Sequence, residues 1–243
     1  MYPTINLFGM SFDSARFFMI LGIFAMIVVN LFRANKFGIS KLKSVAISIT
    51  NNVGAFAGAK ILFLLENLDS LQSNISFGGF SFYGTVFMLP VFMLITYNFY
   101  GMDKKQFLNF STPSVLMELA FYRTGCLLAG CCCGIPAGWG FAMAHSPEVL
   151  RVPVQLIEII LDLGIFATLL YVERKPFFKE NGLLYPLFMV CYGVIRFIIE
   201  FFRVRDILLW GMSESHFLSL LSIAIGVVWI VLAVKKHNKK ASA

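Results

Sequence analysis

Long apolar stretches separated by short polar segments follow one another along the whole chain. About 17 to 25 apolar residues suffice, as an α-helix, to cross about 30 Å of hydrocarbon. Seven stretches have this length: 13–32, 45–65, 80–99, 111–129, 152–172, 183–203 and 216–234. The pattern predicts an all-α, polytopic membrane protein with seven transmembrane helices. No repeat or long linker divides residues 1–243, so we expect a single integral membrane domain.

The polar segments alternate in charge. Thirteen Lys and Arg residues follow the first, third, fifth and seventh stretches, namely Arg33, Lys36, Lys41, Lys43, Lys104, Lys105, Arg174, Lys175, Lys179, Lys235, Lys236, Lys239 and Lys240. Positively charged loops stay in the cytoplasm, which predicts an N-terminus outside and a cytoplasmic C-terminus. The segment after the second stretch agrees, because it holds Glu66 and Asp69 and no Lys or Arg.

Composition supports a membrane protein, because 58% of the residues are hydrophobic and only 14% are charged. These values exclude a disordered chain and a typical soluble protein. A net charge of +7 would suggest nucleic acid as the partner of a soluble chain. In a chain this apolar we expect membrane lipid and no nucleic acid. The first stretch has no cleavage-like segment after it and is interpreted as a retained helix.

Seven of the twenty basic residues lie within a predicted span or near its outer end: Arg16, Lys60, Arg123, Arg151, Arg196, Arg203 and Arg205. A charged side chain at mid-bilayer costs about 2.5–3.5 kcal/mol on insertion scales, so such residues usually line a polar cavity. Snorkelling to the headgroups explains Arg16 and Arg205 and stays open for Arg151 and Arg203. Arg123 and Arg196 are the stronger functional candidates.

The sixth stretch places Arg196, Glu200 and Arg203 at spacings of four and three, on one helical face. A carboxylate between two guanidiniums orients both and leaves a net positive charge. This arrangement suits a phosphate, which Arg binds through a planar fork of donors. A purely structural ion network between helices is the alternative.

A second polar face lies in the fifth stretch, where Gln155, Glu158 and Asp162 follow Pro153 at spacings of three and four. Together with Glu118 and Arg123 of the fourth stretch, these residues predict a shared polar interior.

Residues 122–140 are rich in glycine and hold four of the five cysteines. Glycine permits a break of the helix into a loop that lines a site, although small residues also pack between membrane helices. The adjacent Cys131, Cys132 and Cys133 do not easily converge on one tetrahedral ion, and no Cys or His pair stands at finger spacing, so we expect no metal. Packing thiols or a disulfide are favoured over a nucleophile. His216 is interpreted as a histidine at a helix end.

Three motifs, in order along the fourth, fifth and sixth stretches, resemble those of the bacterial prolipoprotein diacylglyceryl transferases. The family's Gly-Arg-Ile-Gly-Asn-Phe-x-Asn-Gly-Glu is similar to the segment with Arg123, Gly125, Cys126 and Cys131. Its Arg-His-Pro-x-Gln-Leu-Tyr-Glu is similar to residues 151–158, and its Tyr-Gly-x-x-Arg-Phe-x-x-Glu-x-x-Arg matches residues 192–203 in full.

The resemblance implies transfer of a diacylglyceryl group from phosphatidylglycerol to the lipobox cysteine in the signal peptide of a prolipoprotein, at the bacterial inner membrane and without a cofactor. It implies that Arg123 binds the lipid phosphate, that Arg196 stabilises the phosphate and that Glu200 orients the arginines. We expect Arg151, Gln155, Arg203 and Gly125 to contribute to substrate binding.

Three positions depart from the family pattern. Tyr83 stands where the family has the histidine of a His-Gly-Gly segment, and Cys126 and Cys131 replace an Asn and a Glu. A phenol, whose pKa is about 10, is a poor general base but can donate a hydrogen bond, so Tyr83 joins Arg196 and Glu200 as a catalytic candidate. A diverged paralogue with another acceptor, and a lipid carrier without catalytic activity, are the alternatives.

Overall fold

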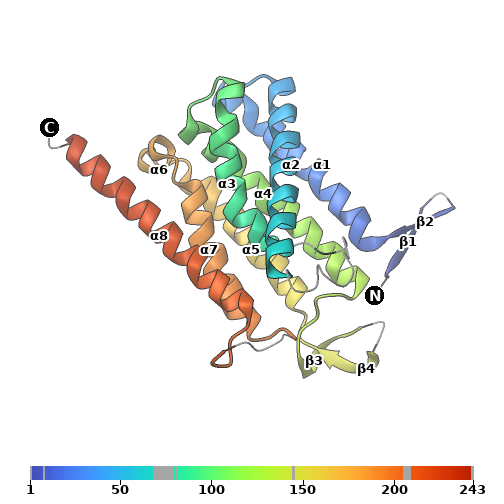
Figure 1. Ribbon diagram of the computed structural model, residues 1–243. Coiled ribbons are helices and arrows are strands. Elements are labelled where there is room, and N and C mark those ends of the chain that lie inside the picture. The colour runs from blue at the N-terminus through green and yellow to red at the C-terminus, as the bar shows by residue number, and fades with distance from the viewer. Residues whose placement is uncertain are drawn as a thin grey trace.

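The computed structural model describes residues 2–7, 9–67, 79, 81–143, 146–204 and 209–241. This part of the chain forms a helical bundle with two small β-hairpins at one end (Figure 1). The long helices are α1 (Ser14–Ala34), α2 (Lys41–Glu66), α3 (Phe82–Thr96), α4 (Lys104–Ala129), α5 (Val154–Val172), α7 (Leu184–Glu200) and α8 (Glu214–Ala241). A short helix, α6 (Pro176–Asn181), and two 3₁₀ turns, η1 (Asn35–Phe37) and η3 (Tyr97–Tyr100), lie in the connections.

Each of the seven apolar stretches overlaps one of these helices, and five helices are long and apolar enough to cross a membrane: Ser14–Phe37, Lys41–Glu66, Phe82–Tyr100, Val154–Val172 and Glu214–Lys239. The other two are α4 and α7. The helix α7 is only 17 residues long. The helix α4 is polar along much of its length, and residues 107–116 of it are all buried, so it packs inside the bundle.

The prediction of an all-α chain misses the two hairpins. Strands β1 (Thr4–Leu7) and β2 (Met10–Asp13) pair antiparallel before α1, and β3 (Pro136–Met143) and β4 (Ser146–Arg151) pair antiparallel between α4 and α5. The strands of the first hairpin have four residues each, and the second hairpin has register shifts, so neither leaves a clear alternating pattern in the sequence.

Helices α2 and α3 touch backbone to backbone. A Cβ atom added to Gly84 would lie 2.2 Å from the carbonyl oxygen of Gly58. Close approach at small residues is a common way for membrane helices to associate, because it maximises van der Waals contact and needs no hydrophobic driving force.

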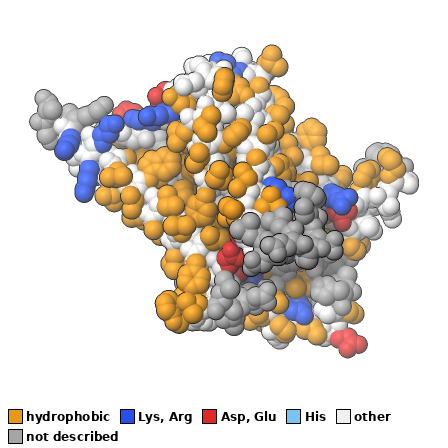
Figure 2. Space-filling model, viewed as in Figure 1, with side chains coloured by type: hydrophobic (Ala, Val, Ile, Leu, Met, Phe, Trp, Pro, Cys, Tyr) orange, Lys and Arg blue, Asp and Glu red, His pale blue; other side chains and the backbone are white. Residues whose placement is uncertain are grey.

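The surface has an apolar middle. Figure 2 shows hydrophobic side chains over most of the visible helical face, whereas basic side chains gather toward the end of α8. Such an apolar band around a helical bundle is expected where lipid is the solvent.

A buried ion cluster joins α1 to the C-terminal end of α5. Glu173 is only 1% exposed, and its carboxylate oxygens lie 2.7 Å from Nη2 of Arg33 and 2.7 Å from Nζ of Lys36. Arg33 also donates to the carbonyl oxygen of Asn109 in α4, at 2.9 Å. The cluster therefore holds three helices together at one end of the bundle.

Replacing Glu173 by Gln is expected to lower the free energy of unfolding by about 3–5 kcal/mol, because the buried guanidinium of Arg33 loses its anion. Thermal unfolding in detergent micelles measures this loss. Glu180→Gln is the matched control, since Glu180 is exposed and offers only its backbone carbonyl to Lys105. Equal melting temperatures for the two variants would contradict the assignment.

Candidate functional site

The expected polar interior is present in part and centres on Glu158 in the second turn of α5, whereas Glu118 forms no ion pair with a described residue and lines a separate cavity. Its Oε2 lies 3.1 Å from Nε of Arg123, and its Oε1 lies 2.7 Å from Nη1 of Arg196. Arg203 also reaches Oε1 through its Nη1, at 3.3 Å. One carboxylate, 4% exposed, thus binds three arginines that come from α4, α7 and the segment after α7.

Glu200 is the second anion of this cluster. Its Oε2 lies 2.9 Å from Nη2 of Arg196 and 3.9 Å from Nε of Arg203. The predicted adjacency of these three side chains is therefore observed, but the helix is shorter than expected. It ends at Glu200, and the backbone of Arg203 forms a bridge with Gly134 in the segment between α4 and α5.

The donors of the two buried arginines are used differently. Both Nη atoms of Arg196 are engaged, one by Glu158 and one by Glu200. Arg123 forms an ion pair with Glu158 through Nε without a hydrogen bond, and among the described residues its two Nη atoms have no hydrogen-bonding partner. The guanidinium of Arg123 also lies 5.8 Å from the ring centre of Tyr122. Arg123 thus has a fork of donors available for an anion.

The ion-paired set carries an excess of one positive charge, since three guanidiniums share two carboxylates. Asp162, one turn after Glu158, is 2% exposed but forms no ion pair with a described residue. An incoming phosphate would therefore meet a fixed array of positive charge that is already oriented.

Tyr83, in the first turn of α3, lies beside this network. Its hydroxyl is hydrogen-bonded to the hydroxyl of Ser219 in α8, and its ring stacks on Phe87 with centroids 5.8 Å apart. The ring of Tyr192 meets it edge-on at 6.2 Å. Tyr83 is also within electrostatic range of Arg196 and Glu200.

The other predicted binding residues shape the surroundings of the network. A Cβ atom on Gly125 would lie 2.9 Å from Cβ of Phe18, so this glycine lets α4 approach α1. Arg151 donates from Nη1 to the carbonyl oxygen of Gly134 at 3.3 Å and makes no ion pair with a described residue. Gln155 donates from Nε2 to the carbonyl oxygen of Cys131 at 2.6 Å. Substrate contacts of these three residues stay predictions.

Ser213 belongs to the site as well, although no sequence prediction names it. Its hydroxyl donates to Oε1 of Glu200 at 3.0 Å, and its backbone N–H donates to Nδ1 of His216 at 3.0 Å. Ser213 directly precedes α8 and His216 is its third residue, so the His216 side chain caps the backbone N–H of Ser213 as Glu does in one half of a capping box. The Ser-x-x-His spacing before an apolar run is a sequence signal for the start of a helix, and it could have indicated Ser213. His216, interpreted as a histidine at a helix end, occupies that position.

The thiols of Cys126, Cys131 and Cys132 lie beside the arginines, with all three sulfur atoms within 4.8 Å of one another. The described structure contains five free cysteines. Hydrogen bonding to the side chains of Cys126 and Cys131 lowers the pKa of the Cys132 thiol, and Arg203 and Arg123 act in the same direction.

An apolar cavity of about 130 Å³ lies between α1, α2, α3 and α4. Tyr122 and Glu118 of α4 line it together with Ala59 and Phe82. The cavity therefore reaches the helix that carries Arg123, on the side where α2 and α3 form the wall.

A family model described as prolipoprotein diacylglyceryl transferase matches residues 5–232. A Clostridium tetani protein named phosphatidylglycerol–prolipoprotein diacylglyceryl transferase is 28% identical over 240 residues, which cover 93% of this chain and 96% of the relative. The protein of that name from Idiomarina loihiensis is 36% identical over 201 residues, 76% of this chain and 74% of the relative. A Clostridium perfringens protein named phosphatidylglycerol–prolipoprotein diacylglyceryl transferase 2 is 26% identical over 250 residues, which cover 97% of this chain and 96% of the relative. The chain therefore belongs to the prolipoprotein diacylglyceryl transferase family.

Proposed function

We propose that the protein transfers the diacylglyceryl group of phosphatidylglycerol to the lipobox cysteine of a prolipoprotein, and that the transfer takes place at the arginine network. The observation that carries this proposal is the state of Arg123. Its Nε atom is ion-paired with Glu158 at 3.1 Å, which orients the guanidinium, while its two Nη atoms remain available to the phosphate.

The reaction needs positive charge more than it needs a protein nucleophile. The acceptor sulfur attacks the glyceryl carbon next to the phosphate, a thioether forms, the carbon–oxygen bond to the phosphate breaks, and glycerol phosphate leaves. The thiol proton passes to a base. Because a phosphodiester becomes a monoester, negative charge grows on the phosphate oxygens in the transition state. Guanidiniums that are already oriented stabilise this charge without reorganising.

Each member of the network has a distinct part in this scheme. Arg123 binds the phosphate through its two Nη atoms. Arg196 and Arg203 add positive charge behind it, and Glu158 and Glu200 hold all three guanidiniums in place. The buried position of these groups strengthens their interaction with the phosphate, since little water screens it.

The apolar cavity next to Tyr122 supplies a place for lipid. Its volume of about 130 Å³ accommodates part of one acyl chain, and most of its lining is apolar, although Asn51, Asn52, Thr85 and Glu118 also line it. The lipid phosphate at Arg123 and the acyl chain in this cavity would then enter from the same side of α4.

We further propose seven transmembrane passes in a bacterial inner membrane, with the N-terminus outside. The basic connections meet at one end of the bundle, because Lys36 binds Glu173, Lys43 donates to the carbonyl of Tyr100, and Lys105 donates to the carbonyl of Glu180. The arginine network lies toward the other end, about 22 Å away along α5 at 1.5 Å per residue. The positive-inside rule then puts the network toward the outer surface, where prolipoproteins arrive.

Tyr83 is proposed to donate a hydrogen bond in the region where the family has histidine. Tyr83→Phe is expected to reduce the transfer rate about tenfold, because the donor is lost while the ring and its stacking on Phe87 remain. Initial rates with purified protein in micelles measure the effect. Ser219→Ala removes the present partner of Tyr83 and keeps the phenol, so it should preserve the rate. A rate for Tyr83→Phe equal to that of the unmodified protein would remove Tyr83 from the reaction.

Mass spectrometry of a reporter preprotein, incubated with the purified chain and phosphatidylglycerol, tests the proposed function directly. We expect the reporter to gain the mass of a diacylglyceryl group, and a reporter with Ser in place of the lipobox Cys to gain nothing. Phosphatidylglycerol binding without transfer would instead identify a carrier. Transfer to a different thiol acceptor would identify a diverged paralogue.

A further inference from the structure

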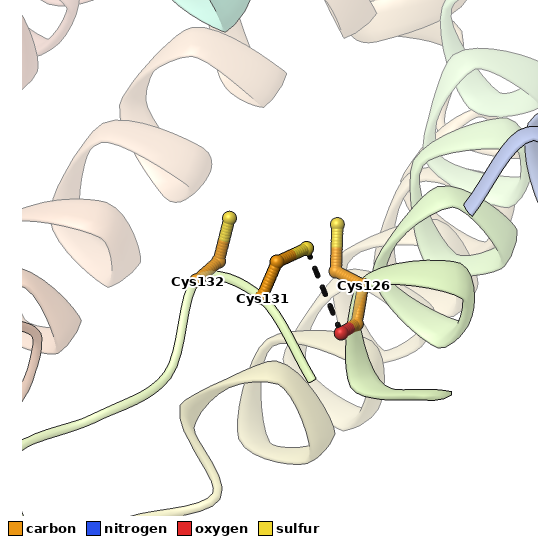
Figure 3. Close-up of side chains that lie close together, drawn as sticks. All are labelled: Cys126, Cys131 and Cys132. Atoms are coloured by element: carbon orange, nitrogen blue, oxygen red, sulfur yellow. Dashed lines mark hydrogen bonds between the residues drawn. The ribbon is translucent and has the colours of Figure 1, made fainter. Parts of the chain in front are cut away.

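Three cysteines that are separated in the sequence by up to six positions converge in space. Figure 3 shows the side chains of Cys126, Cys131 and Cys132 side by side, the first from the end of α4 and the others from the segment that follows. Their sulfur atoms are all within 4.8 Å of one another. We expected no metal because the adjacent residues 131–133 do not easily converge on one ion. The observed cluster is different, because it contains Cys131 and Cys132 together with Cys126 from the end of α4.

Helix capping explains the first pair. Gly130 has φ 75° and ends α4 in the left-handed conformation. Its N–H donates to the carbonyl oxygen of Leu127 at 3.3 Å, and the N–H of Cys131 donates to that of Cys126 at 3.1 Å. These two bonds define a Schellman motif, which brings the residue after the glycine against the residue five positions before it. In most helices that contact is apolar, and here it joins two thiols.

An unusual backbone conformation explains the third thiol. Cys132 has φ 58°, a left-handed value that residues other than glycine rarely adopt. With this conformation the chain reverses direction directly after Cys131, and the thiol of Cys132 joins the other two. Such conformations persist where the surroundings fix them and are concentrated at functional sites.

The segment that carries the cluster is held from two sides. Gln155 of α5 donates to the carbonyl oxygen of Cys131 at 2.6 Å. On the other side, the N–H of Ile135 donates to the carbonyl oxygen of Phe202 at 2.9 Å, just beyond α7. The three thiols are therefore presented by a fixed backbone, which reduces the cost of assembling a ligand set.

We propose that Cys126, Cys131 and Cys132 form a binding site for a soft, thiophilic metal ion, with Zn²⁺ as the probe that defines it. Zinc–thiolate bonds are about 2.3 Å long, so sulfur ligands around one tetrahedral ion lie roughly 3.8 Å apart. The observed separations reach this arrangement through small side-chain movements. Thiolates select soft ions over Mg²⁺ and Ca²⁺, and three of them leave the fourth coordination position open to water or substrate.

The surrounding charges favour such a complex. Three thiolates around a divalent ion carry a net charge of −1, and Arg203 and Arg123 are both within electrostatic range of Cys132. The excess of one positive charge in the neighbouring ion network balances this charge. The inference concerns metal binding alone and stands independently of the proposed transfer reaction.

Metal titration of the reduced, purified full-length chain in detergent micelles tests the proposal. We expect about one Zn²⁺ per chain to survive dialysis, and Cd²⁺ to produce the ultraviolet absorption of a sulfur-to-metal charge transfer. Cys131→Ser and Cys132→Ser should each weaken binding at least 100-fold. Because both side chains are exposed, these variants keep the folded core, which thermal unfolding verifies.

Two further cysteines supply matched controls. Cys133→Ser alters the neighbouring residue in the same segment, and Cys191→Ser alters a partly buried thiol of α7, and neither belongs to the cluster. Both variants should bind Zn²⁺ like the unmodified chain. The proposal is overturned if the reduced chain retains no Zn²⁺, or if Cys133→Ser weakens binding as much as Cys131→Ser.

Discussion

Replacing Glu158 by Gln is expected to slow diacylglyceryl transfer at least about 100-fold and to lower the free energy of unfolding by about 3–5 kcal/mol. The amide keeps the shape of the carboxylate but removes the charge that three arginines share. Glu200, which pairs with Arg196 and Arg203, would then be the one carboxylate left in the ion-paired set, and repulsion between the guanidiniums would push Arg123 away from the position in which it meets the phosphate. Initial transfer rates and thermal unfolding in the same micelles measure the two effects.

Asp162→Asn provides the matched control for this change. It makes the same carboxylate-to-amide substitution one turn further along α5, at a residue that is equally buried and forms no ion pair with a described residue. We expect it to retain most of the activity. If the two variants lose activity to the same extent, Glu158 has no special role and burial of any acid on this face of α5 explains the loss.

Replacing Arg123 by Ala is expected to reduce kcat/KM for phosphatidylglycerol by about 10²–10³-fold, which is the usual effect of removing one donor group from a site where charge develops. Arg123→Lys should recover only part of this loss. An ammonium group keeps the positive charge, but it cannot bind Glu158 and present two further donors to the phosphate at once. The loss should fall mainly on kcat, because the phosphate gains charge in the transition state.

Arg16→Ala is the control for this experiment, since Arg16 is an exposed arginine at the start of α1. It should leave both kinetic constants unchanged. Full activity of Arg123→Lys would show that charge alone is sufficient, and the bidentate role of Arg123 would have to be abandoned.

Much of the fold could be read from the sequence because helix formation in an apolar chain depends on local composition. The seven stretches fall on seven helices, and errors lie at their ends. The helix predicted at 111–129 begins at Lys104, where Asp103 caps it by accepting a hydrogen bond from the N–H of Lys105. The helix predicted to reach 203 ends at Glu200. The hairpins were not predicted, because their short strands lie in connections with no regular alternation of apolar and polar residues.

The sequence predicts which residues belong to the candidate site, but not which of them contact one another. Spacing placed Arg196 and Glu200 on one face of a helix, and the family motifs singled out Arg123. That Glu158 rather than Glu200 unites the arginines depends on how α4, α5 and α7 pack, which a single sequence does not specify. The cysteine cluster depends on the capping of α4 and on the conformation of Cys132, both set by backbone geometry. The hydrogen bond of Ser213 to Glu200 could not be predicted, because it requires the turn into α8 to lie beside Glu200.

The two buried carboxylates of α5 also determine which parts of the bundle can move. Glu158 near the start of the helix and Glu173 just after its end fasten α1, α4 and α7 to it, so these helices behave as one frame. The described contacts of α2 and α3 with that frame are packing and neutral hydrogen bonds, such as those of Asn51 with Ser111 and of Tyr185 with the carbonyl of Val86. The same two helices form one wall of the apolar cavity. A lipid that enters from the bilayer would therefore displace the α2–α3 pair as a lateral gate, while the frame that holds the arginines stays still.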